Sequence, residues 1–201
     1  MPESGKPALG ELAAPAASGF FGTNFQKPAF KPLLFVPAGQ QNEIMAKVIW
    51  WVDAACHERL PKGGNHWCLY LRVGENLSVC IDITPSYTVP STLIPGGSKA
   101  NMIVSLLDYA ISPSAQKIVK FDVMHGTKVG EFIDLFIQHG RHKYEFNSEG
   151  QGCRYWTDDQ INLLHQYGLL VNQTQIQAAK AAILTQWPDE KYYPLVQGGY
   201  Q

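Results

Sequence analysis

The feature that most constrains the fold of this chain is a stretch of alternating side chains between residues 66 and 84. Two runs rich in β-forming residues, 66–73 and 77–84, are joined by Gly74-Glu75-Asn76, a pattern that predicts a β-hairpin. Successive side chains of a strand point to opposite faces of the sheet. With Val73 opposite Leu77, one face of the hairpin is apolar and the other carries chemically reactive groups. The apolar face holds Trp67, Leu69, Leu71, Val79, Ile81 and Ile83, and the other holds His66, Cys68, Tyr70, Cys80, Asp82 and Thr84.

The segments around the hairpin predict an α+β fold. Further strands are expected at 32–37, 46–54, 102–109, 117–123 and 144–146, although 46–54 is also compatible with a helix. Helices are expected at 127–140, from about Cys153 to residue 168, and at 174–187 before Pro188. Three prolines and two adjacent glycines between residues 85 and 99 favour a long surface loop. We therefore expect an antiparallel sheet with helices packed around it.

Length and composition favour one domain. A chain of 201 residues with 45% hydrophobic residues can bury one sizeable core. We expect a single domain over residues 32–190, preceded by a loosely ordered arm at 1–31 that is rich in Ala, Gly, Pro and Ser, and followed by a C-terminal tail at 191–201. The arm lacks the pattern of a secretory signal, and no segment is long and apolar enough to span a membrane. A cytoplasmic location is expected, with the four cysteines as free thiols.

The charge balance excludes some classes of partner. Sixteen Lys and Arg residues against seventeen Asp and Glu residues give a formal net charge of -1, without the basic surface that nucleic acids or anionic membranes require. No glycine-rich phosphate-binding motif is present, and the cysteines and histidines lack the usual zinc spacings. We expect no cofactor, no metal, no nucleic acid and no membrane partner, but a small-molecule substrate.

His66, Asp82 and Cys153 form the candidate catalytic set. Asp82 lies diagonally across the hairpin from His66, close enough to orient an imidazole. Cys153 follows Gly150-Gln151-Gly152 and lies at or near the start of a helix, where a thiol is more easily ionised and free backbone N–H groups could hold an oxyanion. If the helix began instead at Thr157, Cys153 would lie outside it and lose much of this effect.

The same residues resemble a known family. Asn65-His66-Trp67-Cys68-Leu69-Tyr70-Leu71 is similar to the His-Trp-x-x-Tyr strand of circularly permuted papain-like proteins, the NlpC/P60 superfamily branch that includes lecithin:retinol acyltransferase. Gly152-Cys153-Arg154-Tyr155-Trp156 is similar to the Asn-Cys-x-x-Phe start of their nucleophile helix. The run from Asn65 to Trp156 also resembles a group of fungal domains of unknown function. Gly152 departs from the usual Asn, and Asp82 stands where many relatives have a second His.

The resemblance implies a permuted papain-like fold and a cysteine enzyme. His66 would be the base, Asp82 the third polar residue and Cys153 the nucleophile of acyl transfer or of amide or ester hydrolysis. Aromatic and cationic neighbours are candidates for substrate binding, although each also suits a purely structural role: Trp67, Tyr70, Arg154 and Trp156. Two other functions remain open, a small-molecule cyclase or isomerase of a fungal biosynthetic pathway that uses His66 and Asp82, and a binding module without catalysis.

Overall fold

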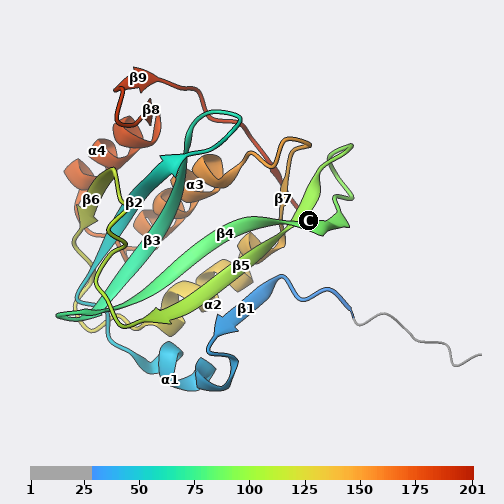
Figure 1. The fold of residues 1–201 in the computed structure, drawn as a ribbon. Coiled ribbons are helices and arrows are strands. Elements are labelled where there is room, and N and C mark those ends of the chain that lie inside the picture. The colour runs from blue at the N-terminus through green and yellow to red at the C-terminus, as the bar shows by residue number, and fades with distance from the viewer. Residues whose placement is uncertain (1–28) are drawn as a thin grey trace, which may run out of the picture.

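One large sheet organises the part of the chain that the computed structural model describes, residues 29–201 (Figure 1). Its strands follow the order β10-β7-β5-β4-β3-β2-β6, and β1 pairs with β5 beside this path. All neighbours on the path are antiparallel, whereas β1 is parallel to β5. The strands are β1 (Leu33–Val36), β2 (Trp51–Arg59), β3 (Asn65–Gly74), β4 (Leu77–Pro90), β5 (Ser98–Leu107), β6 (Lys117–Phe121), β7 (Tyr144–Phe146) and β10 (Gly199–Tyr200).

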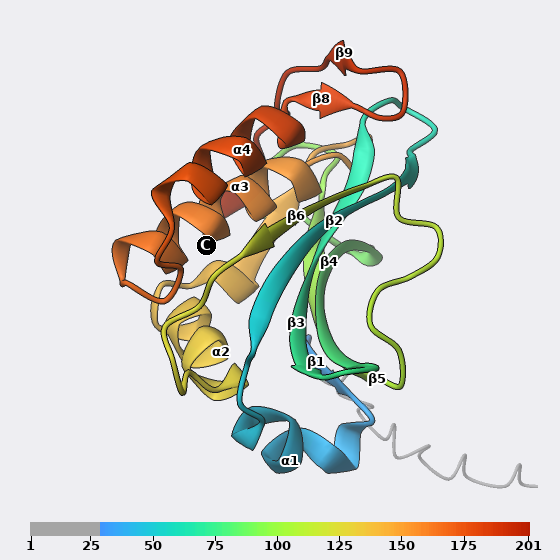
Figure 2. The same ribbon diagram turned by 90° about the vertical axis from the view of Figure 1, so that its left-hand side faces the viewer.

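Helices cover one face of this sheet, as Figure 2 shows in a view along it. The helices are α1 (Gln41–Ala46), α2 (Val129–Gln138), α3 (Cys153–Gln166) and α4 (Gln173–Ile183), with single 3-10 turns at Ala38–Gln40 and Arg141–Lys143. A small separate sheet joins β8 (Thr185–Gln186) to β9 (Lys191–Tyr192). The predicted α+β class and the antiparallel sheet are confirmed.

The β3–β4 hairpin has the predicted register through most of its length. Leu69 pairs with Ile81, Tyr70 with Cys80 and Leu71 with Val79. The apolar face is completely buried in the main core, where it packs with residues of the helices. The register shifts only beside the turn, where Gly74 rather than Val73 pairs with Leu77. The two faces of the hairpin therefore have the characters expected from the alternation of side chains.

The expected loop at 85–99 is mostly strand, which corrects the prediction. β4 continues to Pro90 and β5 begins at Ser98, with Pro85 paired to Ala100 and an irregularity before Pro90 pairs with Ser98. Proline lacks an N–H donor, but it is tolerated where one side of a strand makes no ladder bonds. β3 pairs with β4 only up to Ile81, so the far half of β4 is paired on one side alone. Pro85 and Pro90 both lie in this half of β4.

Two other boundaries differ from the prediction. Within 46–54, α1 ends at Ala46 and β2 begins only at Trp51, where pairing with β3 starts. The last helix ends at Ile183 rather than near residue 187, because the chain turns into β8. Helix α3 begins at Cys153, with Gly152 as its N-cap, so the alternative start at Thr157 is wrong.

The C-terminal segment 191–201, expected as a tail, contributes to the domain. Gly199 pairs with Glu145 and Tyr200 with Tyr144 at the edge of the large sheet. Pairing with β7 satisfies the backbone groups of this segment. A paired stretch of two residues is too short to show the alternating hydrophobicity that predicts a strand. The expected arm, residues 1–31, falls almost entirely outside the described residues. Within residues 29–201, no helix combines the length and apolar content needed to cross a membrane.

Candidate active site

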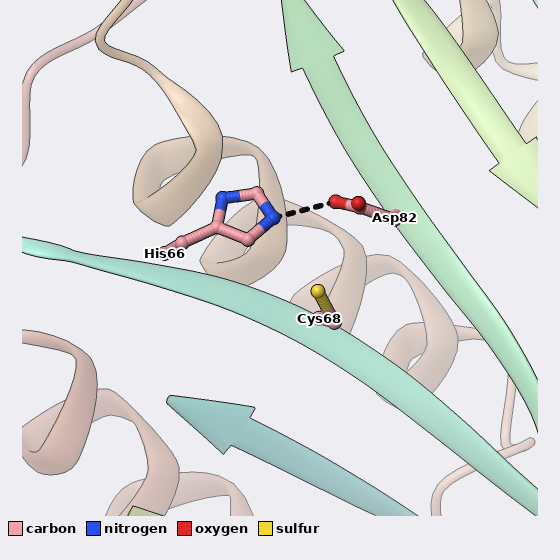
Figure 3. Close-up of side chains that lie close together, drawn as sticks. All are labelled: His66, Cys68 and Asp82. Atoms are coloured by element: carbon pink, nitrogen blue, oxygen red, sulfur yellow. Dashed lines mark hydrogen bonds and ion pairs between the residues drawn. The ribbon is translucent and has the colours of Figure 1, made fainter. Parts of the chain in front are cut away.

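The first element of the site is a hydrogen bond between neighbouring strands. His66 stands at the start of β3 and Asp82 in β4, and the imidazole Nε2 lies 2.7 Å from the carboxylate Oδ1 (Figure 3). Both side chains are about a quarter exposed. This is the diagonal pair that the hairpin register predicts. The carboxylate fixes the orientation of the imidazole ring and stabilises its protonated form.

The second element is the thiol of Cys153 at the first residue of α3. Gly152, the N-cap, has a φ of +149°, a conformation that residues with a Cβ rarely adopt. A Cβ on Gly152 would also lie only 2.8 Å from the Tyr144 hydroxyl oxygen. Both the backbone conformation and the packing therefore require glycine at position 152.

The loop before α3 is held by Asn147. Its side-chain oxygen accepts hydrogen bonds from the backbone N–H groups of Glu149 and Gln151, at 3.0 and 2.8 Å. The Asn147 N–H in turn donates to the Gln151 carbonyl at 3.2 Å. These hydrogen bonds fix the direction in which the chain enters Gly152. The position of Cys153 is therefore set by local hydrogen bonds as well as by the core.

His66 shares one cleft with Asp82 and Cys153, and the Cys153 thiol donates to the Asn65 carbonyl at 3.9 Å. Burial by itself would lower the pKa of His66, but the hydrogen bond with Asp82 and the proximity of Cys153 raise it well above its usual 6.5. Asp82 occupies Nε2, so Nδ1 is the nitrogen left for the thiol. Burial opposes ionisation of Asp82, but its hydrogen bond and charge interaction with His66 lower its pKa. A thiolate beside an imidazolium is the arrangement that makes cysteine nucleophilic.

Backbone N–H groups are available at the same point. The first N–H groups of an α-helix have no acceptor within the helix, and the partial positive charge of the helix is concentrated there. In α3 the first N–H with an intrahelical acceptor is that of Trp156, which donates to Gly152 at 3.0 Å. The preceding N–H groups, beginning with that of Cys153, could therefore stabilise a negative oxygen beside the thiol.

The three side chains open onto one cleft of about 390 Å³. Its remaining lining is largely apolar: Leu60, Ile83, Thr84, Pro85, Tyr87, Phe146 and Gly150. Tyr87 also lines an adjoining hollow with Lys62 and Glu149. It has a φ of +54°, which is unusual for a residue with a side chain, and its hydroxyl group lies close to Gly150. Tyr87 therefore stands at the border between the two hollows.

Residues 52–201 match a family described as a domain of unknown function (DUF7770). The chain belongs to the DUF7770 family. No curated protein and no solved structure matches it. The match includes His66, Asp82 and Cys153 and extends through β10, so the candidate site and the C-terminal strand both lie within the DUF7770 domain.

None of the four expected substrate-binding residues lines the cleft. Trp67 and Trp156 are fully buried in the core, and the Trp156 Nε1 donates to the Arg141 carbonyl at 2.9 Å. Arg154 is also buried, and its guanidinium donates to the backbone carbonyls of Ile183, Tyr193 and Pro194. These contacts use Arg154 to hold the C-terminal segment.

Tyr70 lies deeper on the reactive face of the hairpin. It packs with Cys68 and Cys80 in a small second cluster that includes Ala55 and is covered by Leu107, Ile111 and Ala115. Its hydroxyl oxygen is 3.1 Å from Nε2 of His57, and Nδ1 of His57 is 3.2 Å from the Ser114 hydroxyl. Tyr70 is therefore fixed behind the site rather than in the cleft.

Sequence reasoning missed several cleft residues, and it placed Cys68 on the reactive face of the hairpin without assigning it to the site. Leu60, Tyr87 and Phe146 come from separate parts of the chain, and no spacing pattern connects them to His66. Cys68 has a clearer signal, because it follows His66 by two residues and so shares its face. Its sulfur lies within 4.8 Å of donor atoms of His66 and Asp82. The sequence lacks the residue spacings of standard zinc sites, but donors on neighbouring strands can converge without such spacings.

Proposed function

We propose that this DUF7770 domain is a cysteine enzyme that transfers an acyl group, or hydrolyses an amide or ester, through a thioester on Cys153. The observation that carries the proposal is the His66–Asp82 hydrogen bond in a cleft that Cys153 also lines. The order of elements, with the His strand before the Cys helix, supports a permuted papain-like arrangement of the NlpC/P60 kind. The substrate we propose is a small molecule.

The reaction would begin with attack by sulfur. The Cys153 thiol passes its proton to Nδ1 of His66, and Sγ forms a bond to the carbonyl carbon of the substrate. The carbonyl oxygen becomes negative and is stabilised by the free N–H groups at the start of α3. As the C–N or C–O bond breaks, the leaving group takes the proton from His66. The product of this half-reaction is a thioester on Cys153.

The second half-reaction releases the acyl group. Water or an acceptor with a hydroxyl or amino group gives a proton to His66 and attacks the thioester carbon. The C–S bond then breaks, and the thiolate is reprotonated by His66. Asp82 keeps the imidazole oriented in both halves. The apolar lining of the cleft favours an uncharged acyl group, because the lining residues within 29–201 include no Lys or Arg.

Covalent trapping tests the proposal directly. The reduced full chain is incubated with a small activated ester, and the intact mass and the labelled peptide are measured. We expect an acyl adduct on Cys153 that is lost in Cys153→Ala and strongly slowed in His66→Ala, while Cys56→Ser, which removes a buried thiol outside the cleft, forms it normally. An adduct that persists in Cys153→Ala, or none in a folded wild-type protein, contradicts the proposal.

A further inference from the structure

We propose that His66, Cys68 and Asp82 bind one soft divalent cation of the Zn²⁺ class, and that its binding blocks acyl transfer. The cation site depends on the three side chains alone. Inhibition rests on the function proposed above, because it requires His66 to act as the base. The two parts can therefore fail separately.

The donors converge on one space between β3 and β4. The imidazole nitrogen, the Cys68 sulfur and a carboxylate oxygen of Asp82 all lie within 4.8 Å of one another. Figure 3 shows the sulfur beneath the line that joins His66 to Asp82. His66 and Cys68 share a face because they are two residues apart, and the hairpin register places Asp82 beside them.

The donor set matches the coordination chemistry of zinc. Zn²⁺ binds thiolate, imidazole and carboxylate at about 2.0–2.3 Å in a tetrahedron, whereas Mg²⁺ and Ca²⁺ prefer oxygen ligands. Bond lengths of this size place tetrahedral donors about 3.3–3.8 Å apart. The present His66–Asp82 distance of 2.7 Å must therefore open, while the sulfur moves closer. Side-chain rotations supply such changes without a change in the strands.

The surroundings of the three donors also suit a cation. His66 and Asp82 are partly exposed and line the cleft, so water can occupy a fourth coordination position. Cys68 is buried on the floor of the site and packs against Cys80.

Binding would interfere with the acid–base chemistry in two ways. Nε2 of His66 would bond to the cation, so Asp82 would no longer orient the ring through a hydrogen bond. The Cys68 thiol proton would pass to solvent as the thiolate forms. With Nε2 bonded to the cation, the neutral ring carries its single proton on Nδ1 and has no free lone pair there. His66 could no longer accept the proton of Cys153.

Zinc titration of the metal-free, reduced full chain against a chromogenic chelator tests the site. We expect one Zn²⁺ per chain, and a loss of affinity of about 100-fold or more in Cys68→Ser and in Asp82→Asn, since loss of an indirect partner already costs 10–100-fold. The matched control is Cys80→Ser, which removes the neighbouring thiol, and this variant should bind normally. Equal affinity in Cys68→Ser and wild type overturns the site.

Cobalt spectroscopy provides a second measurement that does not depend on activity or affinity. Co²⁺ should give a thiolate-to-metal charge-transfer band in wild type, Cys80→Ser and Cys153→Ala, but not in Cys68→Ser. Circular dichroism confirms that each variant is folded. Loss of the band in Cys153→Ala would mean that Cys153 supplies the sulfur ligand instead of Cys68, and this would overturn the proposal.

Trapping in the presence of Zn²⁺ separates the two proposals. Stoichiometric zinc should slow acylation of Cys153 by about 10-fold or more in wild type, and this inhibition should disappear in Cys68→Ser. Zinc binding without inhibition overturns the second part only. Normal zinc binding together with a complete lack of acylation in every variant overturns the proposed function and leaves the cation site intact.

Discussion

The Nε2 of His66 lies 2.7 Å from the Oδ1 of Asp82, across two strands that are joined by a short turn. The paired ladder of β3 and β4 ends at Leu69 and Ile81, and the two side chains meet just beyond it. The hydrogen bond orients the imidazole so that its other nitrogen is free for Cys153. The consequences of this geometry can be measured.

Asp82→Asn should lower the rate of Cys153 acylation by about 100-fold or more, since an amide can accept a hydrogen bond but does not stabilise an imidazolium. The measurement is single-turnover acylation followed by intact mass. Asp108→Asn, an exposed aspartate after β5, is the matched control and should leave the rate unchanged. Similar rates in Asp82→Asn and wild type would remove Asp82 from the proposed mechanism.

Gly152→Ala should destabilise the domain and slow acylation. The substitution forces a Cβ onto a residue with a φ of +149° and places it 2.8 Å from the Tyr144 hydroxyl oxygen. We expect a loss of about 2–4 kcal/mol in the free energy of unfolding from strain and overpacking together, measured by urea denaturation. Gly126→Ala separates the two causes, because Gly126 has a φ of +83° and open space around it. A loss no larger than that of Gly126→Ala would contradict the packing argument.

Tyr87→Ala should widen the range of acyl groups that react. Tyr87 stands between the cleft and the adjoining hollow, and its removal joins them. We expect the ratio of acylation rates for a long over a short acyl ester to rise by about 10-fold, the range that a few methylene contacts provide. Tyr87→Phe keeps the ring and should preserve the wild-type ratio. An unchanged ratio in Tyr87→Ala would exclude Tyr87 as a determinant of substrate size.

Arg154→Lys should reduce stability rather than substrate affinity. The Arg154 guanidinium is buried and donates to the carbonyls of Ile183, Tyr193 and Pro194, a set of contacts that an ammonium group cannot reproduce. We expect the free energy of unfolding to fall by about 2–4 kcal/mol, measured in urea. Arg59→Lys, at an exposed ion pair with Asp189, should change it little. A stable Arg154→Lys protein with weaker binding of anionic substrates would restore the substrate-binding role.

Glu145→Gln should weaken the dependence of stability on pH. Burial would raise the pKa of Glu145, but hydrogen bonds from Ser91 and from residues 92 and 93 lower it below 4.5. The folded state therefore binds this proton less readily than the unfolded state, so the stabilisation is present above about pH 4.5 and is lost as the pH falls through the lower folded value. Urea denaturation at neutral pH and near pH 4 should show a smaller difference for Glu145→Gln. Equal pH dependence in both proteins would contradict the assignment.

The local sequence was enough to predict the elements whose structure depends on neighbouring residues. Alternation over 66–84 was enough to predict the hairpin, its two faces and the diagonal approach of His66 and Asp82, because side chains in a strand alternate strictly. Gly150-Gln151-Gly152 was enough to predict a sharp turn before Cys153. The helix over 127–140 followed from the spacing of its apolar residues.

Tertiary structure decided which of these residues meet. Long-range pairing made strands of the proline-containing segment after residue 85 and of the C-terminal Gly199–Tyr200, where local patterns are weak or misleading. Packing buried the side chains of Trp67, Trp156 and Arg154. It placed Tyr87 and Phe146 at the cleft. It also brought Cys153, from α3, to the cleft of the His66–Asp82 pair. The sequence determined the chemical groups and their local directions, but their convergence depends on contacts between distant segments, and no local spacing encodes these contacts.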